Sequence, residues 1–110
     1  MKTSISDAPK RRIDDNLTII DLLTDKKFAF DFIIANLNGT HPKVINRISQ
    51  RVYYILSGNG SVQVSNEMYD VKSGDLVYIP ANTVHSINGE LKYIVITSPP
   101  FNPANEKIIE

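Results

Sequence analysis

The sequence predicts an all-β fold in which short antiparallel strands form a sandwich or a barrel. Short apolar runs recur along the chain, and glycine or asparagine turns separate most of them. No segment carries a convincing helical repeat of apolar residues. A chain of 110 residues has room for a single hydrophobic core. We therefore expect one compact all-β domain.

The strands are predicted from apolar runs and from the turns between them. The first two runs are residues 17–23 and 28–37, and the second alternates only partly, which suits a strand buried on both faces. Further strands are expected at residues 44–48, 52–56, 61–65, 68–71, 76–79, 84–87 and 91–97. Turn residues at 38–42, 58–60, 72–74 and 88–89 are expected to separate them.

The two ends of the chain differ from this middle part. Residues 1–16 are polar and are expected to form an N-terminal arm, followed by a barrel over residues 17–98. Pro99 and Pro100 should end the last strand, because proline cannot donate a hydrogen bond to a sheet. Residues 99–110 are then expected to be a tail that packs on the barrel or on a partner. No repeat or linker indicates a second domain.

Composition excludes several classes of function. The net charge is +0, so no overall field attracts nucleic acid or an anionic membrane. The chain has no cysteine, which removes disulfides and thiolate metal sites. No apolar run approaches the ~20 residues of a membrane span, and the first residues hold no apolar signal region. We expect a cytoplasmic protein without nucleic-acid or membrane partners.

The segment from Gly74 to Gly89 carries the most informative motif. Gly74, Pro80 and His85 match the second signature of the cupin family, G-x5-P-x-G-x2-H-x3-N, at the right spacing. Asn82 stands where the family has glycine, and asparagine tolerates positive φ better than other non-glycine residues. Gly89 stands where the family has asparagine. The chain resembles a small single-domain cupin, which implies a double-stranded β-helix, or jelly-roll, barrel of about 8–10 antiparallel strands.

The first cupin signature, G-x5-H-x-H-x3-E-x6-G, fits without a gap between Gly39 and Gly58. Its three metal-ligand positions then fall on Ile45, Arg47 and Arg51. Of the four metal ligands that the resemblance implies, only His85 is kept, and arginine has no lone pair to offer a metal. We therefore expect no metal and no other cofactor.

Two residues near these positions leave an alternative open. His41 or Gln50 could complete a metal site if the register shifted, which would give a metal-dependent cupin with non-standard ligands. The preferred interpretation of His41 is a solvated turn histidine beside Pro42.

The alternation of side chains along strands places the expected pocket. By the resemblance, the face that holds Ile45 and Arg47 looks into the barrel. Arg51 opens the next strand and shares its face with Tyr53 and Ile55. The expected ligand-binding residues are Arg47, Arg51, His85, Ile45 and Ile55.

Two arginines and a histidine in an apolar barrel suit an anion such as a sugar acid or keto acid. The expected function is binding of an anionic small molecule: a sugar, sugar acid or keto acid. If the protein is an enzyme, the expected chemistry is metal-independent proton transfer of the isomerase or epimerase type. His85 would be the base, and Tyr53 a second catalytic candidate. A non-catalytic ligand-binding or sensing cupin is the alternative. The arm and the Pro-Pro-Phe tail also suggest a homodimer.

Overall fold

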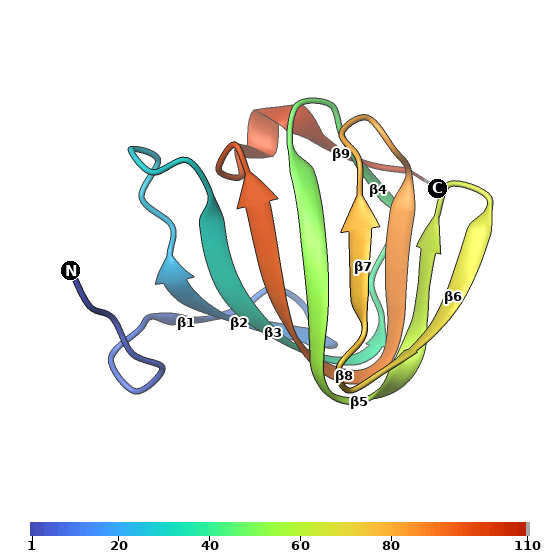
Figure 1. Ribbon diagram of the computed structural model, residues 1–110, viewed down its shortest axis with the longest axis horizontal. Coiled ribbons are helices and arrows are strands. Elements are labelled where there is room, and N and C mark those ends of the chain that lie inside the picture. The colour runs from blue at the N-terminus through green and yellow to red at the C-terminus, as the bar shows by residue number, and fades with distance from the viewer. Residues whose placement is uncertain (110) are drawn as a thin grey trace.

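The computed structural model describes residues 1–109, and within this range nine strands form one curled antiparallel sheet (Figure 1). The strands are β1 (Lys10–Arg12), β2 (Leu17–Leu23), β3 (Asp31–Thr40), β4 (Val44–Asn46), β5 (Gln50–Val64), β6 (Glu67–Lys72), β7 (Leu76–Ile79), β8 (His85–Ser98) and β9 (Glu106–Ile108). One short 3-10 helix, η1 (Pro103–Asn105), precedes β9. The prediction of an all-β barrel is confirmed. No helix in the described range is long and apolar enough to cross a membrane.

Two long strands, β5 and β8, make the barrel. They pair along their whole length, from Gln50 beside Ser98 to Val64 beside His85. Figure 1 shows both strands curving round the base of the molecule, so that each contributes to both walls. One half of β5 also pairs with β7, and the other half with β6. On its other edge β8 pairs with β3, and the curled sheet surrounds a core that includes Ile55, Val62 and Ile87.

Glycines allow these strands to bend without stopping. Residues 58–60 and 88–89 were predicted as turns, but the structure continues β5 and β8 through them. A side chain at Gly58 would place its Cβ 1.9 Å from the Glu90 carbonyl oxygen, and one at Gly89 would lie 2.4 Å from that of Asn59. The glycines thus serve close strand approach at a bend, which a single sequence does not distinguish from a turn.

The loop between β7 and β8 follows the expectation closely. Leu76–Ile79 is a strand as predicted, Pro80 ends it, and His85 opens the next strand. Asn82 adopts φ 58°, which is the positive angle that glycine supplies in the family motif. The Asn82 N–H donates to the Asn46 carbonyl at 2.7 Å, which ties this loop to β4.

Both ends of the chain add strands to the sheet. β1 pairs with β2, and Ala8 just before it is buried against Ile20 and Ile34. At the other end, β9 pairs with β4, with Val44 beside Ile108. The segments expected to be an arm and a tail therefore reach the same barrel, and both contribute residues to the site described next.

Candidate functional site

The barrel encloses a cavity of about 360 Å³ whose wall combines residues from both ends of the chain with residues of the central sheet. Arg11 comes from β1, and Phe101 and Glu106 come from the C-terminal segment. Alternate residues of β2, β3 and β8 point inward, as the strand repeat requires. They supply an apolar wall that includes Leu17, Ile19, Ile33, Ala35 and Val95.

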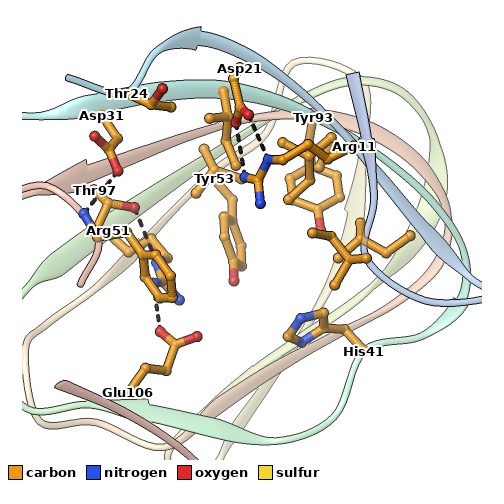
Figure 2. Close-up of a pocket in the computed structure, with 17 residues that line it drawn as sticks. Arg11, Asp21, Thr24, Asp31, His41, Arg51, Tyr53, Tyr93, Thr97 and Glu106 are labelled. Carbon is orange, nitrogen blue, oxygen red and sulfur yellow. Dashed lines mark hydrogen bonds and ion pairs between the residues drawn. The ribbon is translucent and has the colours of Figure 1, made fainter. Parts of the chain in front are cut away.

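Arg51 is the most heavily bonded side chain in the cavity wall. It is only 8% exposed, and each of its three nitrogens has a partner. Nε donates to Thr97 Oγ1 at 3.3 Å, Nη1 to His85 Nε2 at 3.2 Å, and Nη2 to Glu106 Oε1 at 2.7 Å. Figure 2 shows Glu106 facing Arg51 across the lower left of the cavity. The guanidinium is therefore held in place and its charge is compensated.

His85 lies behind Arg51 and is not part of the cavity wall. It is 2% exposed, and its Nδ1 lies 2.9 Å from the Thr83 carbonyl oxygen. A carbonyl only accepts and a guanidinium only donates, so Nδ1 carries the proton and Nε2 accepts from Arg51. Burial, followed by the nearby charge of Arg51, lowers the pKa of His85. This neutral histidine orients Arg51 and has no free nitrogen for a substrate.

Two tyrosines form the back of the cavity. The rings of Tyr53 and Tyr93 meet edge to face with their centres 5.2 Å apart. Figure 2 shows the Tyr53 hydroxyl pointing into the open space between Glu106 and His41. Burial raises the pKa of Tyr53 and raises that of Tyr93 well above its ordinary value, so both remain neutral phenols at pH 7. A neutral phenol can donate a hydrogen bond to a bound molecule.

His41 lies in the connection between β3 and β4 and lines the cavity opposite Arg51 (Figure 2). Its backbone N–H donates to the Ile87 carbonyl at 2.9 Å, which fixes the loop. Its Nδ1 lies 2.9 Å from the Pro42 carbonyl oxygen and must donate to it. In a neutral ring, Nε2 is then left as a hydrogen-bond acceptor. His41 lies in a loop beside Pro42, as expected, and is half-buried, so the ring also lines the cavity.

Acidic groups balance the arginines of the cavity. Arg11 donates to both carboxylate oxygens of Asp21, at 2.5 and 2.9 Å. Asp31 is 7% exposed and accepts from the Phe101 N–H at 2.8 Å through Oδ2. Within residues 1–109, its other oxygen has no hydrogen-bond partner. Burial raises the pKa of Asp31. The site therefore contains two compensated arginines and one carboxyl group that resists ionisation.

The structure brings together only some of the sequence-predicted site residues. Arg51 and Tyr53 line the cavity, with His85 directly behind Arg51. Ile55 is fully buried in the core and does not line the cavity. Arg47 is exposed and Ile45 half-buried, and both lie outside the cavity wall.

The expected facing of β4 is wrong. This strand buries Val44 and Asn46, whereas Ile45 is half-buried and Arg47, just after the strand, is exposed. The Asn46 side chain accepts the N–H groups of Ile48 and Ser49 at 3.1 and 2.8 Å, so its burial leaves its oxygen satisfied. A shift of one residue moves every side chain of a strand to the other face.

The sequence interpretation missed several residues of the cavity wall. Asp21 follows Leu17 and Ile19 on the inward face of β2, and Asp31 precedes Ile33 on that of β3. A carboxylate at the end of an otherwise apolar inward face is a signal that alternation could have revealed. Arg11 and Glu106 carry no comparable signal, because their positions depend on strand pairings of the two chain ends.

The residues present do not fit the divalent metal that the cupin resemblance implies. The four ligand positions hold Ile45, Arg47, Arg51 and His85, and the imidazole nitrogen that faces the site is bonded to a guanidinium. Among the described residues, no three histidine, cysteine, aspartate or glutamate side chains are grouped to hold a metal ion. His41 and Gln50 do not complete such a group.

Comparisons with known proteins agree with this fold. An uncharacterized protein of Methanocaldococcus jannaschii, MJ1618, is 39% identical over 66 residues, which cover 56% of this chain and 53% of that protein. This chain thus matches about half of that relative's length. Among solved structures, Streptomyces Pac13, described as a unique nucleoside dehydratase, has a TM-score of 0.88 at 19% identity and covers 100% of this chain and 91% of its own.

A second solved structure, KdgF from Halomonas sp., has a TM-score of 0.82 at 12% identity and covers 90% of this chain and 94% of its own. At such identities these structures support the fold alone. The sequence model of the cupin domain matches residues 40–97, which is more than half of the chain. This match includes β4, β5, β7 and nearly all of β8, together with Arg51 and His85. The protein belongs to the cupin family.

Proposed function

We propose that this cupin binds a neutral, hydroxyl-bearing small molecule of the sugar or nucleoside class and transfers a proton on it without a metal. The observation that carries the proposal is the cavity of about 360 Å³ in which His41 Nε2 and the Tyr53 hydroxyl face the same space. This volume falls at the lower end of the range for small-molecule sites.

The charges of the cavity favour a neutral ligand over the anion expected from the sequence. That expectation depended on Arg47 and Arg51. Arg47 lies outside the cavity, and Arg51 already has a carboxylate partner at 2.7 Å. The other lining arginine, Arg11, is paired with Asp21. These carboxylates would repel an incoming anion, and both arginines of the cavity wall already have a carboxylate partner.

In the proposed reaction, His41 Nε2 removes a proton from a carbon of the substrate. Tyr53 donates a hydrogen bond to the oxygen on which negative charge develops. The proton then returns to a neighbouring carbon, which gives an isomerisation, or joins a departing hydroxide, which gives dehydration with loss of water. Pac13, a nucleoside dehydratase whose variants have been solved with uridine, supports a nucleoside as the first ligand to try.

The alternative is a cupin that binds the same class of ligand without turnover. The two functions differ in what His41→Gln does, because glutamine keeps a hydrogen-bonding group but cannot serve as a general base. In an enzyme, this variant should lose about 100-fold or more of its turnover with modest change in binding. In a binding protein, only the affinity changes.

The test uses matched pairs of ligands on the wild-type protein. Uridine, other nucleosides and simple sugars are titrated beside their monophosphates or uronic acids, with binding followed by calorimetry and product by mass spectrometry. We expect a neutral member to bind more tightly than its anionic partner. Equal or tighter binding of the anions throughout the panel would reject the proposal.

We also propose that two copies associate through the outer face of the sheet. Tyr54 pairs with Leu76 and with Ile94, and all three side chains point away from the cavity. The next row joins Tyr78, Val52 and Ile96 in the same way. This face is apolar and carries no charge in either row, so a second copy can cover it without burying an ion. The arm and tail, which pair with their own barrel, no longer motivate the dimer.

A further inference from the structure

Arg51 is a buried cation, and among the described residues one of its hydrogen-bond partners is charged. Of the three side chains that hydrogen-bond it, Thr97 and the neutral His85 carry no charge, and Glu106 alone supplies a carboxylate. The side chain of Arg51 is almost entirely buried and that of Glu106 largely so. A charge in such a place interacts strongly with whatever anion lies beside it.

Glu106 belongs to a peripheral element. It opens β9, a strand of three residues whose sheet partner is β4, while Arg51 and its other partners stand on β5 and β8. In Figure 2, Glu106 reaches the cavity from below, apart from the strands that carry Arg51 and Tyr53. Its carboxylate can therefore be removed without changing a residue of the central strands.

We propose that Glu106 is a specificity-determining residue: its carboxylate occupies the anion-binding side of Arg51 and so reserves the cavity for neutral ligands. The inference rests on the proposed function, because it names the residue that sets the charge of the ligand. An anionic ligand would have to displace a carboxylate of the same chain, which is held at a high effective concentration. Without Glu106, the same cavity becomes an anion site.

The experiment is chemical rescue of Glu106→Ala by small carboxylates. Removal of the side chain leaves a space beside Arg51 into which acetate or formate fits. We expect acetate to raise the melting temperature of this variant saturably, and to bind it at least about tenfold more tightly than the wild type. Acetamide, which has nearly the same size but no charge, should have no such effect, and sodium chloride at equal ionic strength controls for screening.

Two further variants locate the effect at Arg51. The double variant Arg51→Met with Glu106→Ala should lose the response to acetate. Asp21→Ala is a matched control, because it removes the carboxylate partner of Arg11, whose side chain is 51% exposed and screened by solvent. Acetate should affect Asp21→Ala no more than the wild type. An equal response of Asp21→Ala, or a retained response of the double variant, would overturn the proposal.

A variant that keeps the size of the side chain covers the case in which Glu106→Ala does not fold. Glu106→Gln preserves an acceptor for Arg51 and removes only the charge, and it should bind inorganic phosphate more tightly than the wild type. Absence of any gain in anion binding in both variants rejects the role of Glu106. These titrations use acetate and phosphate alone. A negative result therefore rejects the role of Glu106 without affecting the test of His41. Failure to find a neutral ligand rejects the proposed function without affecting these titrations.

Discussion

Replacing Arg51 with methionine removes the cation that hydrogen-bonds Thr97, His85 and Glu106. The change leaves the carboxylate of Glu106 without its partner and the buried Nε2 of His85 without a donor. Loss of one partner of a buried ion pair costs about 3–5 kcal/mol, because the remaining charge stays out of water. The unsatisfied imidazole nitrogen adds a smaller loss, about 1–3 kcal/mol. It is offset because the Glu106 side chain, which is 18% exposed, recovers part of its hydration. We therefore expect the free energy of unfolding to fall by about 3–5 kcal/mol.

Urea unfolding at pH 7 measures this loss, and a double-variant cycle identifies its origin. Glu106→Leu combined with Arg51→Met removes both charges and should recover a large part of the stability, since apolar replacement of a buried pair is often nearly neutral. A loss below about 1 kcal/mol for Arg51→Met, or a double variant no more stable than the single one, would refute the reasoning. Either result would mean that the pair is effectively solvated.

Four other predictions follow from particular features of the fold. The pKa of His85 is lowered, so below about pH 6.5 the unfolded chain binds a proton that the folded chain resists. As the pH is lowered below this value, the free energy of unfolding should decrease by up to about 1.4 kcal/mol per pH unit. His85→Gln should flatten this part of the pH profile of urea unfolding. Gly58→Ala should cost more than about 3 kcal/mol, because its Cβ meets a backbone oxygen, whereas Gly74→Ala has a similar φ and open space and should cost about 1–2 kcal/mol; equal losses in urea unfolding would disprove the packing argument. Light scattering should give a dimer for the wild type and a monomer for Leu76→Lys; a wild-type monomer at micromolar concentration rejects the interface. Elemental analysis after purification without chelators should give far less than one zinc, iron, nickel or manganese per chain, and a value near one would contradict the assignment of Arg51.

The fold could be predicted because its signals are local. The spacing of Gly74, Pro80 and His85 identified the loop that precedes β8. The apolar runs at 17–23 and 76–79 predicted two strands with the bounds that the structure shows. The prediction failed at residues 38–40, where β3 continues, and at the glycine-containing segments 58–60 and 88–89. In the last two segments the residue that usually marks a turn instead permits two strands to pass close to each other.

The candidate site was harder to predict because it depends on contacts between distant segments. Arg51 and Tyr53 follow from the alternation along one strand, and both line the cavity. Arg47 was assigned to the wrong face because the inward and outward positions of this strand were taken one residue out of phase. With three residues, β4 is too short for its sequence pattern to show which face is buried. Glu106 reaches Arg51 from 55 positions along the chain, and its approach depends on the pairing of β9 with β4.

The histidine assignments show the same limit. Family spacing singled out His85, and the geometry gives that residue both hydrogen bonds of a structural histidine. His41 stood in a turn beside Pro42, where solvent exposure was the reasonable expectation. It faces the cavity because the loop after β3 is fixed to Ile87 by a backbone hydrogen bond. A sequence pattern that ignores this long-range contact cannot place the ring.

The most direct test of this account is nitrogen-15 NMR of the imidazole rings, because the chain has only two histidines. We predict that His85 keeps its proton on Nδ1 and shows no change when a neutral nucleoside or sugar binds. The Nε2 signal of His41 should shift on binding, and His41→Gln assigns the signals. A ligand that shifts Nε2 of His85 and leaves His41 unchanged would contradict the central claim that His41, and not the family histidine, faces the substrate.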